Sequence, residues 1–215
     1  MTPGVEGAPA GADGTPAASG TDPVGSRLAG YDAVVYDLDG TLVELAVDWD
    51  AVADDVLDAY AERALIPPTE ELWDLLGAAD DYGIRAEVEA AIAGHERPGA
   101  RESARLPLGD RLTGTAAGAD AGSHPPAGVC SLHCEEACRI AVETHGIDVA
   151  LVSDAIVGRD TVEPRKPDPA SLLAAIDRIG AAPEDALFVG DSRSDAVTAE
   201  RGGVDFAWVA DLVAE

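Results

Sequence analysis

Lysine is almost absent from this 215-residue chain: Lys166 is the only one among 14 basic residues, and the rest are arginines. The chain also has 41 acidic residues, which give it a formal net charge of -27. A surface this negative repels nucleic acids and anionic membranes, so we expect neither as a partner. Little lysine beside so much acid is typical of proteins from salt-accumulating halophiles. A GC-rich genome also disfavours lysine, but does not by itself explain the excess of acid.

Long apolar runs are missing as well. No stretch approaches the ~18 consecutive apolar residues that a membrane-spanning helix needs. The N-terminal residues lack both the basic and the apolar region of a secretory signal peptide. The sequence therefore predicts a cytoplasmic protein.

Cysteine is limited to Cys130, Cys134 and Cys138, which do not form the disulfide framework of a secreted protein. Their four-residue spacing, with His133 beside them, suggests either a metal site or three buried free thiols. We favour buried thiols, because zinc sites usually use more closely spaced cysteine pairs. Cys130 is also expected in a strand, whereas the other two lie on the following helix.

Composition divides the chain into segments. Residues 1–29 contain hardly any large apolar side chain and are predicted to form a disordered tail. Residues 30–45 and 106–215 are predicted to form an α/β core, with a flexible loop rich in glycine, alanine and proline at 113–128. Residues 46–105 have a helical pattern and are predicted to be a small cap inserted after the first strand.

The core segments hold short apolar runs that alternate with helical patterns. This alternation predicts a Rossmann-like α/β fold with a doubly wound parallel sheet. The expected strands are Ala33 to Tyr36, Val129 to Leu132, Ala155 to Gly158, Ala186 to Val189 and Phe206 to Val209.

The inserted segment is expected to contain three helices, which start at about Asp48, at Thr69 and at Ile84, the last ending near Ala93. Trp49 and Trp73 belong to this segment. Their rings either contact a substrate or pack the helices together, and we favour packing because it is the commoner use of aromatic residues in helices.

The most informative stretch follows the first expected strand, where residues 37–41 read Asp-Leu-Asp-Gly-Thr. Ligands of open α/β sheets bind at the carboxyl ends of the strands, and Asp37 and Asp39 are predicted there. Gly40 allows a tight turn, and Thr41 supplies a hydroxyl group. This combination suits a phosphate group and a divalent metal ion, although an ordinary turn or a calcium loop can also read Asp-x-Asp-Gly.

Further polar groups are expected at the same sheet edge: Ser131 after the second strand, Lys166 with Pro167, and a Gly-Asp-x-x-x-Asp stretch over residues 190–195. A nucleophilic carboxylate is repelled by a phosphate dianion by about 4 kcal/mol per pair of charges at ~4 Å. Lys166 alone does not balance several carboxylates and a phosphate. We therefore expect a divalent ion, and a site made only of oxygen ligands favours Mg²⁺.

These four motifs resemble, in order and in type, those of the haloacid dehalogenase (HAD) superfamily in its phosphatase branch. The resemblance covers about residues 30–209, and the cap matches only loosely. It implies that Asp37 is the nucleophile, that Asp39 is the general acid and base, and that Lys166 assists catalysis. An aspartate at position 39 favours phosphate esters, because dehalogenases of the superfamily lack a carboxylate there and a halide leaves without a proton.

The same resemblance implies the binding residues. The Mg²⁺ ligands would be Asp37, the backbone carbonyl of Asp39, Asp191 and, directly or through water, Asp195. The phosphate would be bound by Ser131, Lys166 and backbone N–H groups of the turn around Gly40 and Thr41. His133 follows Ser131 closely and could also reach the substrate.

The sequence thus predicts a Mg²⁺-dependent phosphatase that acts on a small phosphorylated metabolite through an aspartyl-phosphate, as a monomer or homodimer. By resemblance the nearest branch is phosphoglycolate-phosphatase-like. A phosphosugar mutase of the same superfamily is one alternative. A non-catalytic scaffold that binds a phospho-ligand or a protein is the other, and four intact motifs argue against it.

Overall fold

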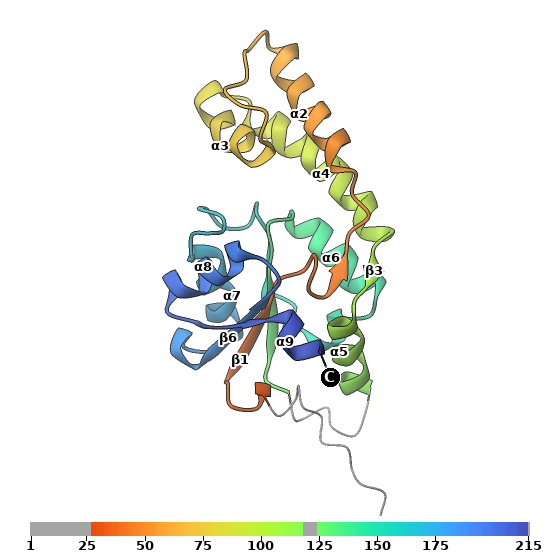
Figure 1. Cartoon of the computed structure of the whole chain (residues 1–215), viewed down its shortest axis with the longest axis vertical. Helices are drawn as coiled ribbons and strands as arrows, with labels where there is room; N and C mark the ends of the chain where they lie inside the picture. The colour runs from red at the N-terminus through yellow and green to blue at the C-terminus, as the bar shows by residue number, and fades with distance from the viewer. Residues whose placement is uncertain (1–26, 118–123, 215) are drawn as a thin grey trace, which may run out of the picture.

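The computed structural model describes residues 27–117 and 124–214 (Figure 1). The predicted disordered tail lies outside the described residues except at its end. There the prediction is wrong, because residues 27–28 form a helical turn and Leu28 is fully buried in the core. The middle of the predicted 113–128 loop, residues 118–123, also lies outside the described residues.

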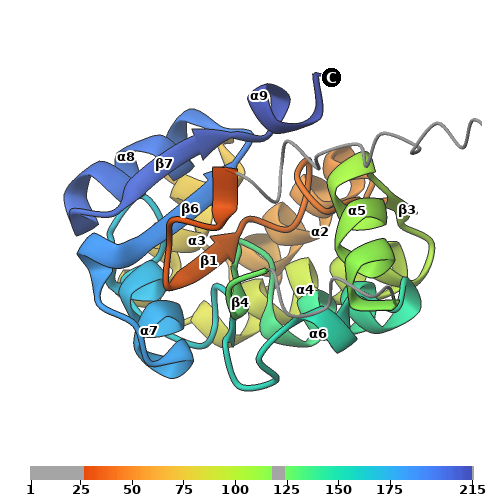
Figure 2. The same ribbon diagram turned by 90° about the horizontal axis from the view of Figure 1, so that it is seen from below.

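A parallel sheet of five strands forms the centre of the molecule, in the order β5-β4-β1-β6-β7. Figure 2 shows β1 between β4 and β6, as this order requires. The predicted α/β fold with a parallel sheet is confirmed. The strands are β1 (Ala33–Tyr36), β4 (Ala127–Cys130), β5 (Ile156–Val157), β6 (Ala186–Gly190) and β7 (Asp205–Trp208).

Helices cover both faces of the sheet (Figure 1). Val34 and Tyr36 of β1 belong to the core cluster that holds α5 and α6, whereas Ala33 and Val35 belong to the cluster of α7 and α8. Alternate side chains of a strand point to opposite faces, so both faces of β1 are apolar and buried. The helices of the core are α5 (Pro107–Ala117), α6 (Glu135–Thr144), α7 (Ala170–Ile179), α8 (Arg193–Gly202) and α9 (Val209–Val213).

Three further helices stand over the carboxyl ends of the strands and pack around an apolar cluster of their own (Figure 1). They are α2 (Trp49–Glu62), α3 (Leu72–Tyr82) and α4 (Arg85–Arg101). We call them the three-helix unit. A two-stranded ribbon of β2 (Val43–Glu44) and β3 (Ala104–Arg105) joins the two connections between this unit and the sheet.

Helix α4 extends well past the end predicted at Ala93 and contains Pro98 in its last turns. It leaves the three-helix unit and packs against α6 of the core. Gly99 allows α4 to pass close to the connection between β2 and α2, since a Cβ atom there would lie 2.8 Å from the carbonyl oxygen of Ala46. One continuous helix therefore links the three-helix unit to the core.

The predicted 113–128 loop is wrong at both described ends, because residues 113–117 belong to α5 and β4 starts at Ala127. The strand that was predicted from Val129 starts two residues earlier, where Ala127 and Gly128 pair with β1. These two residues have low strand propensity, and their pairing is set by the neighbouring strand. Among the described residues, no helix combines the length and apolar character that crossing a bilayer requires.

Candidate active site

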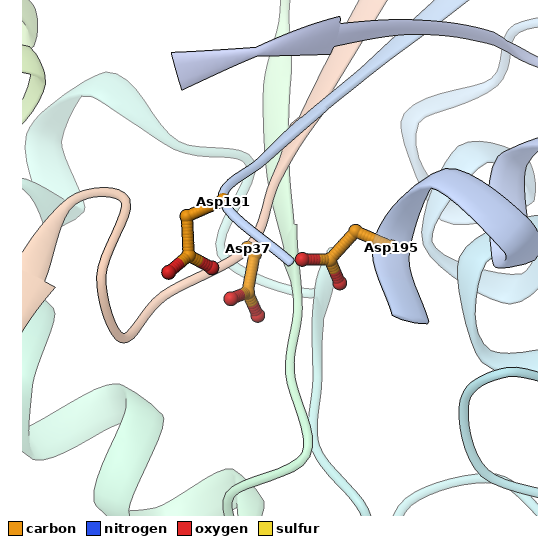
Figure 3. A group of neighbouring side chains, drawn as sticks. All are labelled: Asp37, Asp191 and Asp195. Atoms are coloured by element: carbon orange, nitrogen blue, oxygen red, sulfur yellow. The ribbon is translucent and has the colours of Figure 1, made fainter. Parts of the chain in front are cut away.

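Three carboxylates from two distant stretches of the sequence meet at the carboxyl edge of the sheet (Figure 3). Asp37 directly follows β1, Asp191 follows β6, and Asp195 lies in the first turn of α8. One oxygen of each carboxylate lies within 4.8 Å of the others. The backbone N–H of Asp37 donates to the carbonyl of Val189, which ties the ends of β1 and β6 together.

The side chain of Lys166 reaches this group from the turn before α7. Its Nζ lies 2.8 Å from Asp37 Oδ1 and 2.6 Å from Asp195 Oδ1, and it also donates to the carbonyl of Cys130 at 3.2 Å. Burial opposes its charge, but Asp37 and Asp195 outweigh burial and raise the pKa of Lys166 above its ordinary value. The only lysine of the chain is therefore a fully paired ammonium inside the site.

We call Asp37, Lys166, Asp191 and Asp195 the sheet-edge cluster. It contains three carboxylates and one cation. Burial raises the pKa of Asp37 to about 6, with Lys166 opposing the rise and Asp195 adding to it. Partial burial and the charge of Asp195 also raise the pKa of Asp191. The three crowded carboxylates, only partly balanced by one ammonium, are a set of oxygen ligands that fits a divalent cation.

The second aspartate of the motif, Asp39, points toward the same region without joining the sheet-edge cluster. Its Oδ1 accepts a hydrogen bond from the N–H of Leu45 at 2.7 Å, and its Oδ2 lies 3.5 Å from His133 Nε2. About a third of the Asp39 side chain is exposed. This carboxylate is thus held at one oxygen and is accessible from the cavity described below.

The predicted phosphate-binding residues Ser131, Gly40 and Thr41 lie in different environments. Ser131 is buried after β4, where its Oγ accepts a hydrogen bond from the N–H of His133 at 3.2 Å. Gly40 has the positive φ of 78° that the tight turn requires. The N–H groups of Gly40 and Thr41 donate inside that turn, to the carbonyls of Val43 and Leu38, and phosphate binding by the N–H groups around them stays a prediction. The Thr41 hydroxyl is buried, and none of the residues that the structure describes forms a hydrogen bond with it.

A cavity of about 470 Å³ separates the sheet edge from the three-helix unit. Trp49 and Trp73 line it, with ring centroids 6.0 Å apart, and they also pack against the apolar cluster of that unit. The packing role that we favoured for the tryptophans is confirmed, and contact with a substrate stays a prediction. The polar side chains that line the cavity are Asp37, Asp39, Glu71, Ser131, His133, Lys166, Asp191 and Ser192.

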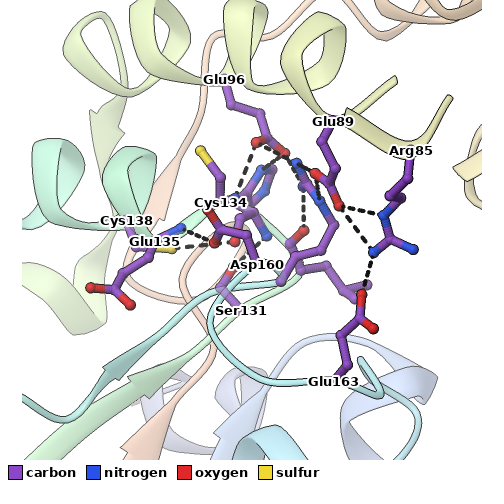
Figure 4. A network of polar contacts seen from close by, with 12 residues as sticks. Arg85, Glu89, Glu96, Ser131, Cys134, Glu135, Cys138, Asp160 and Glu163 are labelled. Atoms are coloured by element: carbon purple, nitrogen blue, oxygen red, sulfur yellow. Dashed lines mark hydrogen bonds and ion pairs between the residues drawn. The ribbon is translucent and has the colours of Figure 1, made fainter. Parts of the chain in front are cut away.

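A second buried group of charges was missed by the sequence reasoning (Figure 4). Glu96 of α4 is fully buried, and its Oε1 lies 2.7 Å from Arg159 Nη1 and 3.0 Å from His133 Nδ1. Arg159 is also buried and forms a second ion pair with Glu89, at 2.9 Å. We call Glu89, Glu96, His133 and Arg159 the α4 cluster.

The charges of the α4 cluster stabilise one another. Burial would raise the pKa of Glu96, but hydrogen bonds from His133 and Arg159 outweigh it and lower that pKa to about 2. Burial likewise opposes a charge on His133, yet Asp39 and Glu96 raise its pKa to about 9. His133 is therefore an imidazolium at neutral pH. A sequence signal existed, since Glu89 and Glu96 are seven positions apart and so share one face of α4.

The three cysteines are buried free thiols, as favoured from the sequence. Burial raises the pKa of Cys130 to about 11 and that of Cys134 to about 12. His133 binds Glu96 rather than a sulfur atom, and the group of possible metal ligands found among the described residues contains neither cysteine nor histidine.

Comparison with known proteins identifies the family. Residues 127–209 match the model of haloacid dehalogenase-like hydrolases. Phosphoglycolate phosphatase of Rhodospirillum rubrum is 34% identical over 190 residues, which cover 80% of this chain and 76% of that protein. This chain belongs to the haloacid dehalogenase-like hydrolase family.

Two further comparisons support the same family assignment. Phosphoglycolate phosphatase 1 of Pseudomonas aeruginosa is 32% identical over 202 residues, which cover 80% of this chain and 66% of that protein. Among solved structures, a HAD-superfamily hydrolase of subfamily IA, variant 1, from Geobacter sulfurreducens superposes with a TM-score of 0.54 at 25% identity, over 82% of this chain and 88% of the other.

Proposed function

We propose that the chain is a Mg²⁺-dependent phosphatase that hydrolyses a small-molecule phosphate monoester through an aspartyl-phosphate. The observation that carries the proposal is the position of Asp37. Its carboxylate lies 2.8 Å from Lys166 Nζ, within 4.8 Å of two other carboxylates, and at the floor of a cavity. The relatives named phosphoglycolate phosphatase support a phosphate ester as the substrate.

The Mg²⁺ ion would be held by Asp37, Asp191, Asp195 and the backbone carbonyl of Asp39. When bound, it would neutralise charge on the transferring phosphoryl group and allow the anionic nucleophile and substrate to approach each other. Lys166 supplies one fixed positive charge to the same phosphoryl group, and the Ser131 hydroxyl a hydrogen bond.

In the first chemical step, an oxygen of Asp37 forms a bond to phosphorus while the bond from phosphorus to the ester oxygen breaks. Asp39 gives its proton to the departing oxygen, so the alcohol leaves neutral. In the second step a water molecule attacks phosphorus, Asp39 takes the proton of that water, and the bond to Asp37 breaks. Inorganic phosphate is released and both aspartates return to their starting state.

We further propose that residues 46–105 act as a cap over a catalytic core made of residues 30–45 and 106–215. Trp49 of α2 and Trp73 of α3 line the cavity opposite the aspartates. A cover of this kind excludes water from the reacting phosphoryl group and determines which leaving group fits. Phosphoglycolate is the first substrate to test, because it is the substrate that the relatives' names give.

The test is the release of inorganic phosphate from phosphoglycolate and from p-nitrophenyl phosphate in the presence of Mg²⁺. We expect release that stops on addition of EDTA and returns with excess Mg²⁺. The purified Asp37→Asn variant gives the background from contaminating phosphatases. No release above this background from a panel of phosphorylated metabolites, or release that EDTA leaves unchanged, would overturn the proposal.

A further inference from the structure

A line of alternating charges runs from α4 to the carboxylate that the proposed mechanism uses as an acid. Figure 4 shows Glu89 and Glu96 extending from α4 into this network. Arg159 Nε lies 2.9 Å from Glu89, and Arg159 Nη1 lies 2.7 Å from Glu96. His133 then bridges Glu96, at 3.0 Å, and Asp39, at 3.5 Å. The line therefore ends at the cavity.

Glu96 is held rigidly at both of its carboxylate oxygens. Oε1 receives Arg159 Nη1 and His133 Nδ1, and Oε2 receives Arg159 Nη2 at 3.2 Å and the backbone N–H of Cys134 at 3.1 Å. A two-pronged arginine–carboxylate pair fixes the plane of the carboxylate as well as its position. Glu96 is thus a fixed acceptor for the imidazole.

The hydrogen bond to Glu96 sets the orientation of the His133 imidazole ring. With Nδ1 bound to Glu96, the ring directs Nε2 toward Asp39 Oδ2. The backbone N–H of His133 bonds to Ser131, and the ring of Trp49 packs 5.7 Å from the imidazole. The other oxygen of Asp39 is already held by the N–H of Leu45. One oxygen of Asp39 is therefore held by a backbone N–H, and the other faces the imidazole of His133.

A contribution to stability is a weak explanation for this network, since buried ion pairs can often be replaced by apolar side chains without loss of stability. We propose that His133, oriented by Glu96 and Arg159, is a positioning residue that aims Asp39 Oδ2 at the oxygen of the leaving group. This inference rests on the proposed function, because it assigns a role in the step that Asp39 performs. A misplaced acid loses much of its effect even when it keeps its proton.

A pair of substrates with different needs for an acid tests the inference. Phosphoglycolate releases an alkoxide, which needs protonation, whereas p-nitrophenyl phosphate releases a stabilised phenolate that departs without a proton. The measured quantity is kcat/KM, because it reports the steps up to leaving-group departure and not the later attack of water. General acid catalysis contributes about 10²- to 10⁴-fold, so we expect Glu96→Gln to lower kcat/KM for phosphoglycolate by at least about tenfold. For p-nitrophenyl phosphate we expect less than about a twofold change.

Glu89→Gln is the matched control, because Glu89 lies on the same helix and pairs with the same arginine but is not a partner of His133. It should leave the ratio of kcat/KM for the two substrates at its wild-type value. His133→Gln, which keeps an N–H group near Nε2, should change that ratio less than His133→Ala. These two variants also answer the question if Glu96→Gln fails to fold.

The outcomes separate the two proposals. A wild-type protein inactive on every phosphate ester would contradict the proposed function itself. An active wild type whose Glu96 and His133 variants lose activity equally on both substrates, or lose none, would contradict the positioning role alone. A change in the ratio that Glu89→Gln reproduces would also contradict it.

Discussion

Within the part of the chain that the structure describes, the sheet-edge cluster and the α4 cluster differ in their balance of positive and negative charge. The sheet-edge cluster sets three carboxylates against one ammonium and opens into the cavity. The α4 cluster sets two carboxylates against a guanidinium and an imidazolium, with Arg159 and Glu96 fully enclosed. Similar side chains thus have two different results. The sheet-edge cluster can accept a further cation, whereas the charges of the α4 cluster balance one another.

The difference follows from the cost of burying charge. A buried ion is tolerated only when opposite charges and hydrogen bonds replace its water. In the α4 cluster, partners within the protein supply all of that replacement for Glu96. In the sheet-edge cluster, burial and the charge of Asp195 raise the pKa values of Asp37 and Asp191, and one ammonium faces three carboxylates, which leaves a deficit of positive charge. That deficit is what a divalent ion would fill.

The largest expected effect comes from neutralising the centre of the sheet-edge cluster. Asp37→Asn removes the proposed nucleophile while keeping its shape, so kcat should fall by at least about 10⁴-fold. The thermal unfolding midpoint should stay close to that of the wild type, because the substitution lowers a local excess of negative charge. Near-normal phosphate release by this variant would remove Asp37 from the mechanism.

Disrupting the α4 cluster should lower the stability of the fold, in addition to any effect on catalysis. Glu96→Ala leaves Arg159 buried without its main partner and should lower the free energy of unfolding by about 3–5 kcal/mol. Urea denaturation followed by circular dichroism measures this. The double variant Glu96→Leu with Arg159→Met removes both charges and should recover most of the loss. A loss below about 1 kcal/mol for Glu96→Ala would mean that the two clusters do not differ in the way described.

The charge on His133 gives a smaller, pH-dependent effect. Its pKa rises from 6.5 to about 9 on folding, so the protonated imidazole stabilises the folded state. This contribution, at most about 3 kcal/mol, is fully present below pH 6.5 and is lost as the pH rises through about 9. The stability difference between the wild type and His133→Gln should shrink over that interval. A difference that stays constant with pH would show that His133 is neutral in the folded protein.

Salt should have the smallest effect and should distinguish the exposed charges from the buried ones. With a net charge of -27, the exposed surface repels itself, and molar KCl screens that repulsion. We expect the free energy of unfolding to increase by about 1 kcal/mol from low to molar KCl. The loss caused by Glu96→Ala should not change with KCl, because that cluster is buried. A melting curve unchanged or lowered by KCl would contradict the halophilic interpretation.

The sheet and its polar edge were predictable because each piece carries a local signal. The apolar runs at Ala33–Tyr36 and Ala186–Gly190 are buried strands with β-branched or aromatic residues, and the motif aspartates follow them directly. Parallel strands place their carboxyl ends at one edge, so the meeting of Asp37, Asp191 and Asp195 follows from topology. Lys166 stood out by being the only lysine.

The α4 cluster and the path of α4 were not predictable in the same way. Pro98 within the helix is a local signal for a helix end, and packing against α6 overrides it. Glu96 and Arg159 are 63 positions apart, and each looks like an ordinary surface charge until the fold encloses it. The first two residues of β4, Ala127 and Gly128, likewise depend on pairing with the neighbouring strand β1 rather than on their own strand propensity.

Lys166 has a practical consequence for anyone who handles this protein. Its Nζ is the only side-chain amine of the chain, and it is almost completely buried. Amine-directed reagents therefore have one side-chain target, which lies at the floor of the cavity and is reached only through that cavity or when the surrounding core opens. Covalent labelling followed by mass spectrometry thus reports on the integrity of that floor, and immobilisation through surface lysines is not an option for this chain.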